Sequence, residues 1–130
     1  MYSRYEEGTG SMKLPVVIAM LSLGATAASA DPLPKPAAFA MCGVCHKVEA
    51  GAAPAIGPNL WGVGGRVSGT VPGYTYSPAM KAAKIKWTKS EIISYIANPQ
   101  AKIPGNKMTY AGEKDPAKEA AIADYLMSLK

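Results

Sequence analysis

The chain has two cysteines and one histidine, and all three lie in the five-residue segment Cys42-Gly43-Val44-Cys45-His46. Three such side chains cannot complete a four-ligand Cys/His zinc site, and one cysteine pair excludes a scaffold of several disulfides. A disulfide across this two-residue gap is strained and reactive, so it is not expected to stabilise a fold. What the chain folds around is therefore decided by the chemistry of this segment.

The C-x-x-C-H pattern is the attachment signature of haem c. Two thiols separated by two residues can each form a thioether to one edge of a haem, and the histidine that follows is then held beside the iron. The alternatives are a thioredoxin-like redox pair, half of a zinc site, and chance. A redox pair is expected in a βαβ pattern, which is missing, and a zinc site lacks further ligands. The segment thus predicts one covalent haem c, attached through Cys42 and Cys45, with His46 as an iron ligand.

Composition is typical of a small globular protein. The 130 residues have room for one domain, and 48% are hydrophobic while 18% are charged. Fourteen basic residues against nine acidic ones give a net charge of +5, without the run of basic residues that favours a nucleic-acid groove. We therefore expect no nucleic-acid partner and favour an acidic protein surface instead.

The segment from Met12 to Ala30 has the features of a secretory signal peptide. A lysine follows Met12, an apolar stretch runs to about Ala28, and small residues precede Asp31. This stretch is short for a membrane span, which needs about 20 residues. We expect cleavage after Ala30 and a periplasmic protein, with a retained membrane anchor as the alternative. The predicted organisation is an upstream extension or mis-start at 1–11, a signal peptide at 12–30 and one folded domain at 31–130.

Helix signals in the remaining chain are separated by long loops. A short helix is expected from near Ala37, and segment 47–76, rich in glycine and proline, predicts a long irregular loop. Capping signals predict three further helices, which begin at Ser77-Pro78, Thr88 and Asp115-Pro116. The second of these should stop at Asn98-Pro99, and the apolar face of the last should pack on the first helix of the domain. No strand alternation is present, so the predicted fold class is all-α.

A second iron ligand is needed if the haem transfers electrons, because such iron prefers six ligands. No second histidine exists, so a methionine thioether is the alternative, although most methionines only fill a core. Met41 is too close to the attachment motif, and Met80 and Met127 lie on expected helices. Met108 ends the loop Ile103-Pro104-Gly105-Asn106-Lys107-Met108, whose backbone can project a side chain inward. The sequence therefore predicts Met108 as the second ligand.

Further motifs accompany the attachment segment. They are Gly57-Pro58-Asn59-Leu60, Gly65-Arg66, Pro72-Gly73-Tyr74, Tyr76, Trp87, Tyr95, Asn98-Pro99, and Ile103-Pro104-Gly105 before Lys107-Met108. In these residues the sequence resembles the class I cytochromes c, specifically the mitochondrial group and its bacterial periplasmic relatives. The pattern applies without gaps from Cys42 to Tyr125. The resemblance implies the class I cytochrome c fold, with about four short helices and long loops around one covalent haem.

The resemblance also implies roles for single residues near the haem. Pro58 would accept a hydrogen bond from the free ring nitrogen of His46 and so fix its tautomer. Arg66, Tyr76 and Trp87 would donate hydrogen bonds to the haem propionates, because buried carboxylates without donors are costly. All of these residues are therefore expected to border one haem site.

Around the second ligand, the resemblance implies that Tyr95 places its hydroxyl near the Met108 sulfur. Asn106 would join a hydrogen-bonded water network beside it, and Tyr110 would lie near the exposed haem edge. Met80 departs from the family, which often has a polar residue there near the inner propionate. We therefore expect that hydrogen bond to be lost.

A second departure concerns the packing of the first helix. Phe39 lies one residue nearer to Cys42 than the aromatic residue that the family usually has on this helix. Contact between Phe39 and Tyr125 is therefore not implied by the resemblance.

The predicted function is that of a soluble electron carrier, which moves one electron on a His/Met-ligated haem c between respiratory or dehydrogenase partners. With both axial positions filled, no site is left for a substrate, so the chain is predicted not to be an enzyme. Lysines around the haem edge would steer docking to acidic redox partners, and a monomer is expected. These are Lys47, Lys81, Lys84, Lys86, Lys89, Lys102 and Lys107. The alternatives are an open-site haem protein of peroxidase or gas-binding type and a membrane-tethered or subunit cytochrome.

Overall fold

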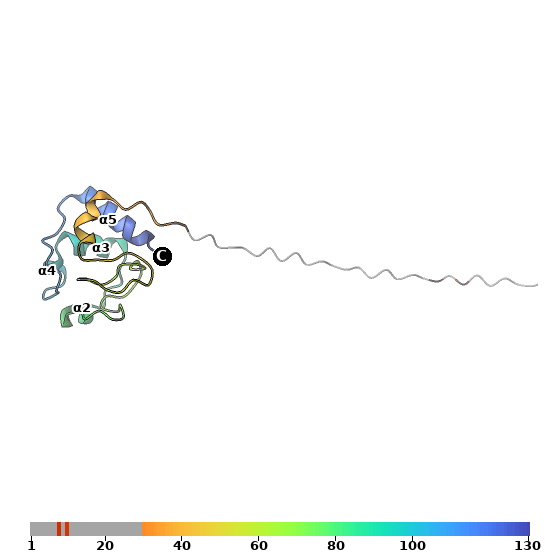
Figure 1. The fold of residues 1–130 in the computed structure, drawn as a ribbon, viewed down its shortest axis with the longest axis horizontal. Coiled ribbons are helices and arrows are strands. Elements are labelled where there is room, and N and C mark those ends of the chain that lie inside the picture. The colour runs from red at the N-terminus through yellow and green to blue at the C-terminus, as the bar shows by residue number, and fades with distance from the viewer. Residues whose placement is uncertain (1–7, 9, 11–29) are drawn as a thin grey trace, which may run out of the picture.

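The computed structural model describes Gly8, Gly10 and residues 30–130, so most of the predicted upstream extension at 1–11 and all of the predicted signal peptide except Ala30 lie outside the described residues. Short helices and long loops make up the fold (Figure 1). In chain order they are η1 (Ala37–Phe39), α1 (Ala40–Gly43), α2 (Pro78–Ala83), α3 (Lys89–Ala97), α4 (Pro99–Lys102) and α5 (Pro116–Ser128). Across 30–130 the only strand-like pairing is an isolated bridge between Val67 and Lys86. The all-α prediction is therefore confirmed.

Three helices begin where the capping residues predict. The side chain of Ser77 accepts a hydrogen bond from the backbone N–H of Met80 at the start of α2. Thr88 caps α3 through the N–H of Glu91, and the carboxylate of Asp115 caps α5. Because each cap satisfies an otherwise unpaired N–H, it fixes both the helix and the loop that enters it.

Helix α4 was not predicted. The sequence correctly ends α3 before Asn98-Pro99, but Asn98 then caps a new helix by accepting a hydrogen bond from the N–H of Ala101 at 3.1 Å. Proline is well suited to the first helical position, since its fixed φ matches the helix and its missing N–H is not needed there. The same dipeptide therefore ends one helix and begins the next, and α4 leads directly into the loop of Met108.

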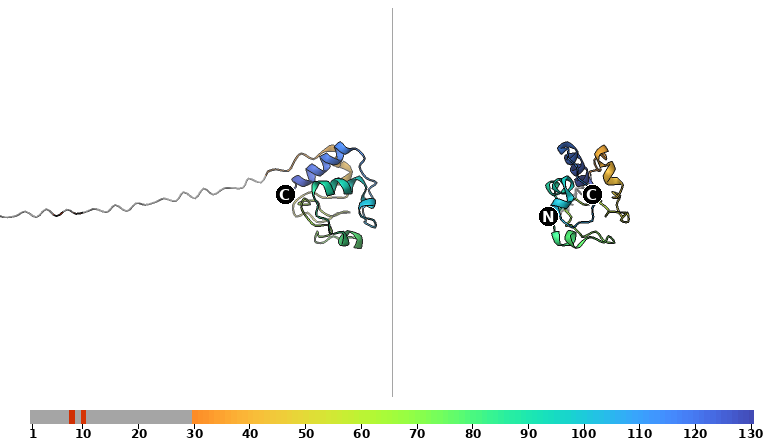
Figure 2. Two further views of the ribbon diagram at one scale, coloured as in Figure 1. Left: turned by 180° about the vertical axis from the view of Figure 1, so that it is seen from behind. Right: turned by 90° about the vertical axis from the view of Figure 1, so that its left-hand side faces the viewer.

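The core lies where α5 packs against α3 and against η1 (Figure 2). Phe39 is 1% exposed, and its ring meets that of Tyr125 edge to face, with centroids 5.2 Å apart. The predicted packing of the last helix on the first is therefore confirmed, and it includes the Phe39–Tyr125 contact that the family pattern did not imply. Two segments from opposite ends of the domain thus form one wall.

The long loop predicted at 47–76 contains no helix or strand. Backbone hydrogen bonds hold it in place instead: Gly65 N–H donates to Trp87 O at 2.8 Å, and Trp87 N–H donates to Arg66 O at 2.9 Å. Ser68 N–H likewise donates to Ile85 O at 2.7 Å. The loop and α2 thereby form a second wall, which faces the helical one.

Candidate cofactor site

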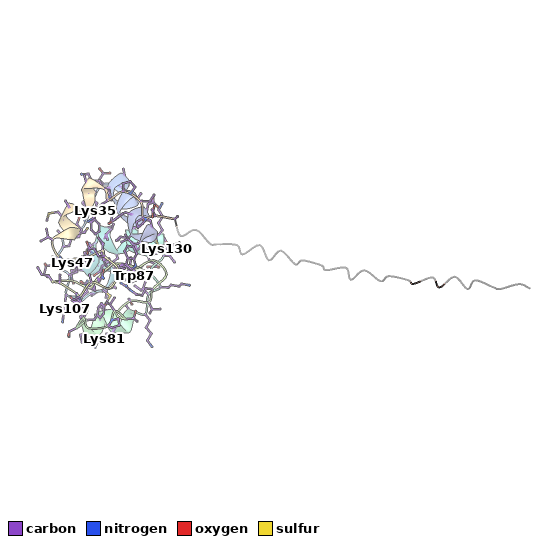
Figure 3. All side chains as sticks on the ribbon, turned by 45° about the vertical axis from the view of Figure 1, so that its right-hand side comes forward. Lys35, Lys47, Lys81, Trp87, Lys107 and Lys130 are labelled. Atoms are coloured by element: carbon purple, nitrogen blue, oxygen red, sulfur yellow. The ribbon has the colours of Figure 1, made fainter. Side chains whose placement is uncertain are left out.

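A cavity of about 510 Å³ lies between these walls, within the range of small-molecule and cofactor sites. Aliphatic and aromatic side chains form most of its lining. The predicted binding residues that line it are Cys42, Cys45, His46, Pro58, Arg66, Tyr76, Trp87, Tyr95 and Met108. Asn106 is the exception, since it lies behind the lining. Trp87, labelled in Figure 3, is buried, with 8% of its surface exposed.

His46 is held in one orientation by the loop that follows it. Its Nδ1 lies 2.8 Å from the carbonyl oxygen of Pro58. This loop is tied back to the attachment motif, because Gly57 N–H donates to Cys45 O at 2.8 Å. Gly57 has no side chain to obstruct the ring: a Cβ there would lie 2.5 Å from His46 Cε1. Glycine is therefore required at this position for the imidazole to reach Pro58.

The Pro58 contact also decides which nitrogen of His46 is free. A carbonyl oxygen only accepts hydrogen bonds, so Nδ1 must carry the proton and donate it. Burial lowers the pKa of His46, and the bond to Pro58 opposes this only in part. The ring is therefore neutral at pH 7, and Nε2 keeps its lone pair for a ligand.

A helical turn at the end of α1 sets the positions of the two cysteines. Cys45 N–H and His46 N–H both donate to Cys42 O, at 3.1 and 3.0 Å. This turn places both thiols and the imidazole in the lining of one cavity. The two thiols are not joined to each other, and burial raises the pKa of Cys42. Both sulfurs are therefore free for bonds to a group in the cavity.

Met108 is held by the buried side chain of Asn106. The amide oxygen of Asn106 accepts a hydrogen bond from Met108 N–H at 2.8 Å. Its amide nitrogen donates to the carbonyls of Pro99 and Ile103, both at 2.8 Å. The loop carrying Met108 is thus fastened to the first residue of α4 and to the residue that follows the helix by direct bonds to the backbone.

Tyr95 reaches the same amide from α3. Its hydroxyl donates to the oxygen of Asn106 at 3.3 Å, and its ring lies 5.2 Å from that of Trp87. Burial raises the pKa of Tyr95, so its hydroxyl keeps its proton in the neutral range. Tyr95 and Asn106 therefore act together on the backbone of Met108.

Arg66, Tyr76 and Trp87 gather hydrogen-bond donors at the cavity. Arg66 donates to the carbonyls of Trp61 and Asn59, each at 3.1 Å, and three of its five N–H groups have no partner among the described residues. The Tyr76 oxygen accepts from Val71 N–H at 3.2 Å, so its own proton is free to donate. The group therefore suits a ligand with carboxylates.

Met41 and Met80 also line the cavity, whereas Met127 does not. Met41 directly precedes Cys42 on α1 and is 67% exposed. Met80 lies on α2, where its backbone is bonded to Ser77 and Ser68. A methionine side chain has no hydrogen-bond donor, so the loss of the propionate hydrogen bond at this position stays a prediction.

These residues fit a haem c. The cavity is apolar and large, and its wall offers two free thiols, a neutral imidazole with an open Nε2, and a thioether. The absence of a Cβ at Gly57 leaves room for the imidazole. The donor set is one that haem iron and its attachment require.

Comparison with known proteins agrees with this site. A family model described as cytochrome c matches residues 36–130. The chain belongs to the cytochrome c family. It is 46% identical to cytochrome c2 iso-2 of Magnetospirillum fulvum, over 72% of this chain and 97% of that protein. It is 51% identical to cytochrome c-550 of Nitrobacter winogradskyi, over 60% of this chain and 72% of that protein.

A solved structure also resembles this cytochrome c. Cytochrome cH from Methylobacterium extorquens has a TM-score of 0.64 and 38% identity, and the match covers 68% of this chain and 89% of that one. The predictions of a class I cytochrome c, of covalent haem c and of electron transfer are therefore confirmed. Members of this family are electron carriers that work with redox partners.

Two residues that matter for this cytochrome c had no role in the sequence analysis. Gly57 belongs to one of the motifs named in the sequence, but it is one of many glycines in its loop. Its close approach to His46 therefore cannot be inferred from the sequence. Gln100 donates to two backbone carbonyls of the Met108 loop. No sequence pattern marks a glutamine that bonds to the main chain.

Proposed function

We propose that this cytochrome c carries its electron on a haem ligated by His46 and Met108 and that it is not an enzyme. The observation that carries the proposal is the shared cavity: a neutral imidazole with a free Nε2, a thioether and both attachment thiols line it. When bound, the haem supplies a one-electron cycle between ferric and ferrous iron. With His46 and Met108 as ligands, the haem would have no open coordination position for a substrate.

The chain itself keeps the two ligands in place through this cycle. Pro58 fixes the ring of His46, and Asn106 fixes the backbone of Met108. Both residues would therefore keep their places in either oxidation state of a bound haem. We propose that Arg66, Tyr76 and Trp87 donate hydrogen bonds to the haem propionates. The donors would be the remaining N–H groups of Arg66, the hydroxyl of Tyr76 and the indole N–H of Trp87.

We propose that partners dock over the mouth of the cavity. Met41, Val44 and Ile56 belong to its lining and yet are 67%, 67% and 73% exposed. Exposed apolar side chains together at a site mark a contact surface. In Figure 3, Lys47 and Lys107 lie at the left of the body, Lys81 lies at its lower end and Lys130 lies at the right. The proposed partner therefore has an apolar centre and acidic residues around it.

Electron transfer to such a partner should depend on salt. We expect the association rate with an acidic redox protein to fall steeply with ionic strength, because exposed charges are screened. Lys47→Ala should slow association about twofold at low salt, and Lys130→Ala should have a smaller effect. Stopped-flow absorbance measures both rates, and reduction by uncharged hydroquinone serves as the salt-independent control. Equal rates at low and high salt would refute electrostatic steering.

We also propose that the chain is exported and that its leader is removed after Ala30, leaving 31–130 as the mature domain. No helix in the described part of the chain is long and apolar enough to cross a membrane. The intact mass of exported protein, measured with a pyridine haemochrome spectrum, should correspond to a chain starting at Asp31 plus one haem. A mass that still includes the leader would favour the tethered cytochrome instead.

A further inference from the structure

Gln100 lies on the surface of α4 and points its amide at the loop of Met108. Its Nε2 is 3.1 Å from the carbonyl oxygen of Asn106 and 3.1 Å from that of Met108. Both partners are acceptors, so only the NH₂ group can face them, and it has one hydrogen for each. The side chain therefore bridges the two carbonyls that flank Lys107 and Met108.

The Met108 loop has few other attachments on this side. Asn106 accepts from Met108 N–H, and the ammonium group of Lys107 donates to Thr75 O at 2.7 Å. Among the described residues, the next backbone–backbone hydrogen bond after the one from Asn106 N–H is from Glu113 N–H to Ile96 O. Within that part of the chain, Gln100 is thus the donor that holds the carbonyl of Met108 itself.

The helix that carries Gln100 is itself well anchored. Asn98 caps it, and Lys102 pairs with Glu91 of α3 at 2.6 Å. Ile103, which follows the helix, is buried in the core. A hydrogen bond from Gln100 therefore connects the loop to a well-anchored part of the fold.

We propose that Gln100 is a positioning residue that latches the Met108 loop in its closed conformation. This inference rests on the proposed ligation by Met108. Both Gln100 bonds must break when the loop moves away from the cavity, because they join the loop to α4. A contact that stabilises only another part of the fold would remain intact during this movement. Gln100 therefore sets how often the thioether leaves its place, and through this the access of other ligands.

The test uses the haem-loaded protein and imidazole as a competing ligand. Gln100→Glu has the same shape but presents a carboxylate, without donors, to the two carbonyls. We expect ferric Gln100→Glu to bind imidazole about tenfold more tightly than the wild type. This is the change that follows if the free energy favouring the closed loop falls by about 1.4 kcal/mol. Gln100→Arg, which restores donors, should return the affinity toward the wild-type value.

Ala101→Glu is the matched control, because it adds the same charge to an exposed neighbouring position of α4. It should leave imidazole affinity unchanged. Guanidinium unfolding is measured on the same samples. If Gln100→Glu lowers stability but leaves imidazole affinity at the level of Ala101→Glu, the contact is only structural and the latch is refuted. If the wild-type ferric protein lacks the weak red absorption band of sulfur-ligated iron, the proposed ligation fails instead.

Discussion

Met108→Ala is expected to lower the reduction potential by on the order of 0.2 V, since axial ligands tune haem potentials over roughly 0.8 V. A thioether sulfur favours the ferrous state more than water in its place does. The ferric variant should also lose its weak red absorption band. Spectroelectrochemistry measures both changes in one sample. The predicted result is a larger shift than that of any other single methionine replacement.

Met80→Ala is the matched control for this experiment, because Met80 lines the same cavity from α2. It removes a thioether and leaves the loop of Met108 untouched. We expect the red band to persist and the potential to shift far less. If Met80→Ala abolishes the band and Met108→Ala retains it, the assignment of the second ligand is wrong.

Gly57→Ala is expected to be a strongly damaging substitution at the cofactor site, although it adds only one methyl group. The new Cβ would lie 2.5 Å from His46 Cε1 and 2.7 Å from Nδ1, so the ring must move away from Pro58. We expect the free energy of unfolding to fall by about 2–3 kcal/mol through overpacking and a lost hydrogen bond. The fraction of chains with attached haem should fall as well. Guanidinium unfolding and the haem-to-protein ratio measure the two effects.

Gly43→Ala provides the comparison for Gly57→Ala within the same site. Gly43 ends α1, and a Cβ there would meet Phe39 only at an ordinary contact distance of 3.8 Å. Alanine also favours the helix, so stability should be unchanged or slightly raised. Similar losses in both variants would mean that the motif tolerates no added volume at all, and the specific contact with His46 would not be the cause.

Local signals in the sequence predicted most of the helical fold. Side chains such as Thr88 and Asp115 act on N–H groups two or three residues away, so a cap is visible in a short window. Helix α4 was missed because proline after Asn98 was interpreted only as a stop. A single turn that depends on its cap has too little periodicity to be recognised.

The site was predictable to the extent that it depends on residue types. The attachment segment and the loop of Met108 were found from sequence, and the structure brings them to one cavity. The position of Asn106 behind the cavity lining was not predictable, because it depends on how the loop folds back onto Pro99 and Ile103. The role of Gln100 was hidden for the same reason, since its partners are main-chain atoms.

The edge-to-face contact between Phe39 and Tyr125 affects how the domain folds. Nearly the entire folded chain forms the interval between these rings, so closing it carries the entropic cost of a long loop. Contacts of such high sequence separation slow folding. A nascent chain cannot complete this wall until α5 has emerged, and a truncated product that lacks α5 would be left with the ring of Phe39 uncovered and open to proteolysis.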